Sequence, residues 1–117
     1  MANDLAPVDV TLSALADPTR RAVVDLLGTG PKRAGELAAS VGMSGPAMSR
    51  HLRVLRVKGL VEEEHTRHED ARLRVYRLRP QPFVQLRNWL TEVEALWSDQ
   101  LAGFKAYAES PRKGKRQ

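Results

Sequence analysis

Cysteine is absent from the sequence. Disulfide bonds, thiolate metal sites and cysteine nucleophiles are therefore excluded. Other catalytic arrangements are missing too: no nucleophile stands beside a base, no glycine-rich loop suited to phosphate occurs, and no paired carboxylates share a face. We expect a protein that is not an enzyme, with no catalytic residues and no cofactor.

Aromatic residues are scarce, at 5% of the 117 residues. Leucine, valine and alanine dominate the apolar residues, which is typical of a mostly α-helical chain and not of a strand-rich barrel. A chain of this length is expected to form one domain, at the small end for a stable monomer. Association with a second copy would add to its core.

Long apolar runs are absent as well. No stretch approaches the ~18 apolar residues that a membrane helix needs, and the first residues lack a basic region followed by an apolar run. We therefore expect no membrane partner and a cytoplasmic location.

The net charge of +5 is unevenly distributed. Residues 44–80 carry +4 and residues 111–117 another +4, whereas residues 1–43 and 81–110 are weakly acidic. Positive charge gathered in this way suits a polyanion such as DNA. A basic end is by itself usually only solvated, so we expect a basic disordered tail over residues 111–117.

One segment, residues 44–60, organises the rest of the chain. Ser44 is suited to cap a helix, Pro46 fits the first turn because no intrahelical donor is needed there, and Gly59 ends the helix. At about 100° per residue, apolar and polar side chains separate to opposite sides. The core side comprises Met48, Leu52 and Leu55, and the outer side comprises Pro46, Ser49, Arg50, Arg53 and Val57.

The outer side has the chemistry of a nucleic-acid contact. Arg50 and Arg53 can form paired hydrogen bonds to a guanine edge or a phosphate, and Ser49 can donate or accept in a groove. A solvated surface helix would show the same arginines. The neighbouring segments therefore decide between the two interpretations.

Three helices are expected before this segment, over residues 8–15, from Pro18 to about Gly28, and over residues 31–41. Asp17 is suited to cap the second helix. The third helix, a glycine turn and the helix after it predict a helix-turn-helix over about residues 33–58. An ordinary helical hairpin would look similar.

Period-two patterns follow. Residues 60–66 and 73–79 alternate as strands do, and residues 67–72 form a polar connection, so a hairpin is expected over about residues 60–79. A hairpin after a helix-turn-helix is a wing, and it must pack against the helices to be stable. Three arginines of the wing, and a lysine just before it, are expected to contact DNA phosphates: Arg67, Arg72, Arg74 and Lys58. Alanine at Arg72 would then weaken binding to all sequences alike.

The last predicted element is a long helix over about residues 83–108. Its apolar residues recur at three and four, which is the spacing of a packing seam: Phe83, Leu86, Leu90, Val93, Trp97, Leu101 and Phe104. We expect this seam to be a dimer interface, although a helix folded back on its own domain is the alternative. Residues 1–110 would then form a single winged helix-turn-helix domain.

Four runs, in order and in register, resemble the ArsR-type winged-helix repressors of bacteria: Leu15–Arg21, Gly35–Ala38, Ser49–Leu55 and Gly59–Val61. The resemblance covers roughly residues 10–108. It implies a homodimer that binds an inverted-repeat operator with two recognition helices in adjacent major grooves. The fold class it implies is mostly α with a small β-hairpin and a long C-terminal dimerisation helix.

In this chain, the resemblance implies that residues 44–58 form the recognition helix. The resemblance then implies DNA contacts at Ser44, Ser49, Arg50 and Arg53. Family members often have a long polar or basic residue where this chain has Gly45, which leaves more of the reading to the two arginines. His51 is expected to pack inside the motif.

The family is known chiefly for metal sensing, but the ligand positions do not match. Where thiolate sensors carry Glu-Leu-Cys-x-Cys, this chain has Glu-Leu-Ala-Ala-Ser at residues 36–40, which offers no sulfur ligand. The last helix has no histidine. His65 and His68 stand among acidic residues, but a three-residue step along a strand puts their rings on opposite faces. We expect no metal site.

Two further interpretations stay open. The aromatic residues of the last helix could line a pocket for an unknown small-molecule effector, although dimer core is the simpler interpretation of Trp89, Trp97, Phe104 and Tyr107. The leading function is a sequence-specific DNA-binding transcriptional regulator, and we favour a repressor. The alternative is a winged-helix module that binds a protein partner or binds DNA non-specifically as an architectural protein.

Overall fold

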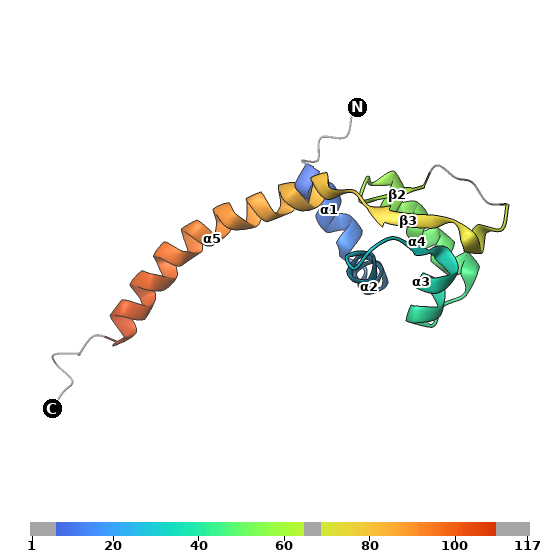
Figure 1. Ribbon diagram of the computed structural model, residues 1–117. Coiled ribbons are helices and arrows are strands. Elements are labelled where there is room, and N and C mark those ends of the chain that lie inside the picture. Colours follow the sequence, from blue (N-terminus) through green and yellow to red (C-terminus); the bar gives the residue numbers. More distant parts are fainter. Residues whose placement is uncertain (1–6, 65–68, 110–117) are drawn as a thin grey trace. The chain divides into compact units, whose positions relative to one another are not determined.

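The computed structural model describes residues 7–64 and 69–109. The chain divides into two compact units, residues 1–86 and residues 87–117. The described elements follow in the order α1 (Pro7–Leu15), α2 (Pro18–Leu27), β1 (Lys32–Arg33), α3 (Ala34–Val41), α4 (Gly45–Val57), β2 (Val61–Glu63), η1 (Ala71–Leu73), β3 (Val75–Leu78) and α5 (Pro80–Glu109) (Figure 1). The expected mostly helical class is confirmed. The basic tail expected over residues 111–117 lies outside the described residues.

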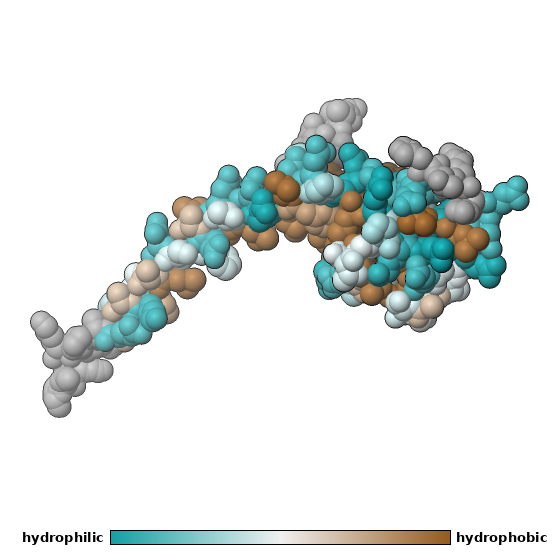
Figure 2. Space-filling model, viewed as in Figure 1, coloured by the Kyte–Doolittle hydropathy of each residue, from teal (hydrophilic) through white to brown (hydrophobic). Residues whose placement is uncertain are grey.

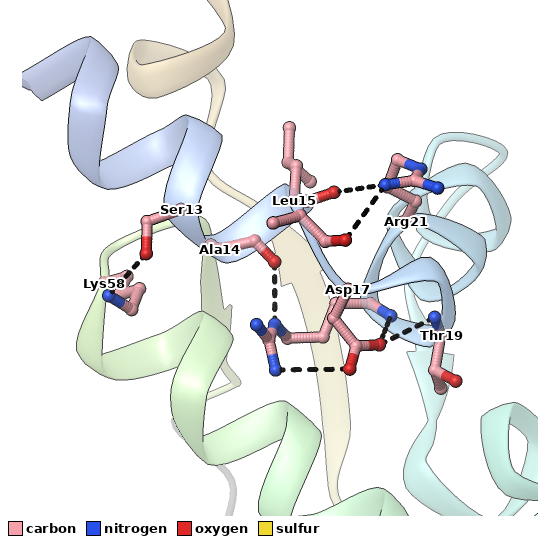
Figure 3. Close-up of polar contacts among 9 residues, drawn as sticks. Ser13, Ala14, Leu15, Asp17, Thr19, Arg21 and Lys58 are labelled. Atoms are coloured by element: carbon pink, nitrogen blue, oxygen red, sulfur yellow. Dashed lines mark hydrogen bonds and ion pairs between the residues drawn. The ribbon is translucent and has the colours of Figure 1, made fainter.

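The junction between α1 and α2 is held by Asp17, which precedes α2, and by two arginines of α2 (Figure 3). Asp17 caps α2 as expected, because its Oδ1 accepts the backbone N–H of Arg20 at 3.1 Å. Arg20 Nε donates to the carbonyl oxygen of Ala14 at 2.7 Å, and Arg21 donates to that of Leu15 at 2.7 Å. The two arginines therefore satisfy carbonyls at the end of α1 that have no partner within the helix.

The helix-turn-helix is formed by α3 and α4. Gly42 ends α3 in the left-handed conformation, with φ of 68°, which glycine adopts at little cost. Ser44 caps α4 as predicted, its Oγ accepting the backbone N–H of Ala47 at 3.2 Å. The third helix begins at Ala34, however, and not at residue 31, because Lys32 and Arg33 are in extended conformation.

The β component is larger than the predicted hairpin. It is a three-stranded antiparallel sheet in the order β1-β3-β2, in which Lys32 pairs with Tyr76 and Glu62 pairs with Arg77. The strand β1 was missed because two charged residues carry no alternating apolar pattern. The expected second strand is also shorter than 73–79, since Leu73 belongs to the 3₁₀ turn η1.

The core is formed by residues of α1, α2, α3 and α4 together with residues of the sheet. Met48, Leu52 and Leu55 of α4 are buried, as their spacing predicted. They pack with buried residues from the other elements: Ala14, Val23, Leu27, Ala34, Leu37, Ala38, Leu60, Val61 and Tyr76. This core fixes which side of α4 remains outside.

The last helix, α5, begins at Pro80, three residues earlier than predicted, and has no buried residue among those described. Phe83 packs against the core of its own unit, so only part of its surface remains for a partner. Further along, Leu90, Trp97, Leu101 and Phe104 are exposed. Apolar side chains recur along this helix between polar ones (Figure 2). No described helix combines the length and apolar character needed to cross a membrane.

Candidate nucleic-acid interface

The outer side of α4 is a solvent-exposed basic face. Pro46, Ser49, Arg50, Arg53 and Val57 are all exposed, which is the division of the helix that the sequence predicted. Because Met48, Leu52 and Leu55 anchor the opposite side, the direction of this face is set by the core and not by the flexible arginine stems.

The charge of this face is uncompensated within the described part of the chain. Residues 44–58 contain three arginines and one lysine but no acidic residue. Among residues 7–64 and 69–109, no carboxylate forms an ion pair with Arg50, Arg53 or Arg56. These guanidinium groups are therefore available to phosphates and to guanine edges.

Arg56 is a residue of this surface that the sequence interpretation did not select. It is exposed, and its charge opposes the rise in the pKa of Tyr76, which burial causes first and the charge of Glu63 increases. Arg56 therefore lies on the side of α4 that turns toward β3. The signal was in the sequence, since Arg56 follows Arg53 by three residues on one helical face.

Ser49 and Arg72 are brought together by the fold. Both line an apolar hollow of about 370 Å³ between the first turns of α3 and α4 and the turn η1. Most of its lining has small or no side chains: Ala34, Gly35, Gly45, Pro46 and Ala71. The hollow joins the start of the candidate recognition helix to the wing.

The guanidinium of Arg72 is engaged by Asp70. Nη2 donates to Oδ2 at 2.7 Å and Nε donates to Oδ1 at 3.0 Å. The hydrogen bonds to Asp70, followed by the charge of that carboxylate, raise the pKa of Arg72 above its ordinary value. Arg72 remains exposed at 76% of its side-chain surface, so the pair lies on the surface of the molecule.

Two other wing arginines are paired across the sheet. Arg77 Nε donates to Glu62 Oε2 at 2.9 Å, between residues that are also strand partners. Arg74 Nε lies 3.8 Å from Glu63 Oε2. In residues 61–64 and 69–79, five carboxylates accompany four arginines. The described wing is therefore close to electrically neutral, in contrast with α4.

Lys58 lies far along α4 from Ser44 and contacts α1. It stands at the C-terminal end of α4, about 20 Å along the helix from Ser44 at 1.5 Å per residue. Its Nζ donates to Ser13 Oγ of α1 at 3.3 Å (Figure 3). Arg67, the remaining predicted contact, lies outside the described residues.

Histidine and acidic side chains are the candidate metal ligands of this chain. Within the described residues, no group of three or more histidine or acidic side chains is arranged to hold a metal ion. His65 and His68, the two histidines of the wing sequence, lie outside the described residues. His51 lies near Asp17, where its charge contributes to lowering the pKa of that carboxylate after the larger effect of the Arg20 backbone N–H.

Comparison with known proteins identifies the family. Residues 17–63, from the cap of α2 to the end of β2, match the model of the bacterial regulatory proteins of the arsR family. The HTH-type transcriptional regulator Rv2034 of Mycobacterium tuberculosis is 40% identical over 102 residues, which cover 87% of this chain and 89% of that protein. The chain belongs to the ArsR family. It is therefore a regulatory protein, and the expectation that it is not an enzyme is confirmed.

Two more similarities bear on this ArsR-family chain. The transcriptional repressor SdpR of Bacillus subtilis is 31% identical over 77 residues, covering 66% of this chain and 81% of that protein. A homodimeric winged helix-turn-helix DNA-binding domain of Mycobacterium bovis, known from a solution structure, superposes with a TM-score of 0.58 at 25% identity. That match covers 81% of this chain and 91% of the other. The expected winged helix-turn-helix fold is confirmed.

Proposed function

We propose that this ArsR-family chain is a homodimeric, sequence-specific transcriptional repressor that binds an inverted-repeat operator in double-stranded DNA. The observation that carries the proposal is the basic face of α4, whose arginines are exposed and have no carboxylate partner among the described residues. Exposed arginines on a rigid, core-anchored helix are what major-groove reading requires.

Within this proposal, residues of α4 have different roles. Arg50 and Arg53 point away from the core and read base edges. Ser49, at the border of the hollow, donates to a base or a phosphate. Ser44 uses its hydroxyl oxygen to cap the helix and has the hydroxyl hydrogen left to donate. The N-terminal half of α4 therefore enters the major groove.

The homodimer is supported by the seam of α5. Leu101 and Phe104 expose 59% and 70% of their surfaces in the single chain, on a helix with no buried residue in its described part. Packing this seam against a second copy removes it from water. The relative from Mycobacterium bovis, described as homodimeric, supports the same assembly. A two-fold dimer presents two copies of α4, and from this we expect the operator to be an inverted repeat.

Repression follows from occupancy of the operator, and the similarity to a Bacillus subtilis repressor supports this direction of regulation.

We also propose that the chain does not sense metal through thiolates, because it has no cysteine and carries Ala38, Ala39 and Ser40 where such sensors have sulfur ligands. We place its action in the bacterial cytoplasm, where its DNA target is.

A selection of random duplex DNA on the purified protein, repeated at two salt concentrations, tests the proposal. The expected result is an inverted repeat whose half-sites are about one helical turn apart, recovered at both concentrations. Salt-sensitive binding without a motif would overturn it in favour of an architectural role. No binding at either concentration would favour a module that contacts an acidic protein.

A further inference from the structure

Asp70 and Arg72 of the wing form several hydrogen bonds with each other. Asp70 has two functions at once. Its Oδ1 accepts the backbone N–H of Arg72 at 3.0 Å, which caps the turn η1, and both carboxylate oxygens accept from the Arg72 guanidinium. The side chain and the backbone of Arg72 are thus held by the same carboxylate.

The turn that carries this pair is attached to the helix-turn-helix. The backbone N–H of Ala34 donates to the carbonyl oxygen of Arg74 at 2.9 Å, and Arg72 lies directly against Gly35. Within η1, Leu73 and Arg74 donate back to Asp70 and Ala71 at 3.0 and 3.2 Å. The pair is therefore held at a defined place, beside the hollow that Ser49 also lines.

Pairing changes what Arg72 offers to DNA. A phosphate that approaches the guanidinium also approaches the Asp70 carboxylate, whose oxygen lies 2.7 Å from Nη2. The attraction to one charge is then opposed by the repulsion from the other. The arginines of α4 carry no such opposing partner among the described residues.

We propose that Asp70 is a specificity-determining residue: it withholds Arg72 from DNA phosphates and so lowers sequence-independent binding, leaving discrimination to the arginines of α4. This inference rests on the proposed DNA-binding function. It also changes the expectation for the wing: removing both charges of the Asp70–Arg72 pair costs little affinity, because the pair contributes almost no net charge. Arg72→Ala alone removes the charge that offsets the Asp70 carboxylate, which then repels phosphate.

The test uses the full chain and its Asp70→Asn, Arg72→Ala and doubly substituted variants. Affinity is measured by fluorescence anisotropy for the selected operator and for a scrambled duplex at several salt concentrations. Asparagine retains an oxygen that can cap η1. Circular dichroism and thermal unfolding establish that each variant folds.

Asp70→Asn is expected to bind the scrambled duplex about two- to eightfold more tightly per bound subunit at 0.1 M salt. The slope of log affinity against log salt becomes steeper by up to about 0.9 per subunit. The operator gains less, so the ratio of operator to scrambled affinity falls. Arg72→Ala in the Asp70→Asn background returns the slope to the wild-type value and the affinity to within about twofold of it. Arg72→Ala alone weakens binding to both duplexes, because it removes the charge that offsets the Asp70 carboxylate.

Glu62→Gln is the matched control, because it adds the same charge by releasing Arg77 from a pair of similar length on the same wing. If Glu62→Gln had an equal effect on affinity and slope, the effect of Asp70→Asn would be explained by the change in net charge alone, and the proposal would be overturned. An unchanged slope in Asp70→Asn would also overturn the proposal. A large loss of affinity in the doubly substituted variant would overturn it as well, because it would show that Arg72 contacts phosphates while it is paired with Asp70.

Failure of the proposed function can be distinguished from failure of this inference. If the proposed function is wrong, the wild-type chain shows no preference for any sequence. The role of Asp70 is measured independently, from the salt dependence of binding to the scrambled duplex. If neither the wild type nor Asp70→Asn binds either duplex at low salt, both proposals are wrong.

Discussion

Arg72 lies so close to Gly35 that a Cβ at position 35 would be 3.3 Å from the Arg72 carbonyl oxygen and 3.4 Å from the Arg72 Cβ. Gly35 is in the first turn of α3, where glycine would otherwise be a poor choice because it costs helix stability. The close approach of η1 explains why glycine occupies position 35. It is also what connects the wing to the helix-turn-helix.

Gly35→Ala is therefore expected to gain less stability than an ordinary glycine-to-alanine change in a helix. Gly45→Ala is the matched control, since Gly45 also stands in a first helical turn and a Cβ there would meet nothing within 4 Å. We expect Gly35→Ala to be less stable than Gly45→Ala by about 1 kcal/mol, because the helix-propensity gain is cancelled by the displaced turn. Urea unfolding of the two variants measures the difference. Equal stabilities would show that η1 moves aside without cost.

The Asp17 carboxylate makes stability depend on pH. The backbone N–H of Arg20 is the largest cause of the lowered pKa of Asp17, which lies below its ordinary value of 3.8. A carboxyl whose pKa is lower in the folded state contributes stability above its unfolded pKa and loses it as pH falls through the folded pKa. Asp17→Asn, which keeps a capping oxygen, should unfold at a lower temperature than the wild type at pH 7. The difference should narrow below about pH 3.9.

Thermal unfolding of both proteins between pH 7 and pH 2.5 provides the measurement for Asp17. Comparing the two proteins at each pH removes the effect of the other carboxylates, which are common to both. A difference in melting temperature that stays constant over the whole range would show that the charge of Asp17 contributes nothing beyond the hydrogen-bonded cap.

Arg53→Ala is expected to reduce the preference for the operator over a scrambled duplex by about 1–3 kcal/mol, because an arginine that reads a base edge contributes discrimination of this size. Arg87→Ala removes the same charge from an exposed position on α5 and should leave the preference intact. Competition binding at two salt concentrations measures both variants. If Arg53→Ala kept the full preference, the reading face would have to be placed elsewhere on α4.

Leu101→Glu is expected to convert the dimer into monomers at micromolar concentration, because it places a charge within the apolar α5 seam. Ala95→Glu adds the same charge to an exposed position on the opposite side of the helix and should leave the dimer intact. Sedimentation equilibrium gives the two masses. A monomeric wild-type chain, or a Leu101→Glu variant with the dimer mass, would contradict the assignment of the seam.

Much of the fold could be predicted because the signals are local. A cap such as Ser44 or Asp17 acts on N–H groups two or three residues away, and the side of α4 that is buried follows from the spacing of Met48, Leu52 and Leu55. Hence the amino-acid sequence alone determined the order of the helices, the helix-turn-helix and the outward direction of Arg50 and Arg53.

Only the tertiary structure decided which charges are available. β1 pairs with β3 across about forty residues of sequence, and the partners Glu62 and Arg77 are fifteen residues apart. Such pairs depend on strand register, which no local pattern specifies for two- to four-residue strands. The pairing of Asp70 with Arg72 was equally undetermined, because a side chain two residues away is reached only when η1 turns the backbone. The sequence therefore determined where the basic residues are, and the fold decided which of them remain available to bind DNA.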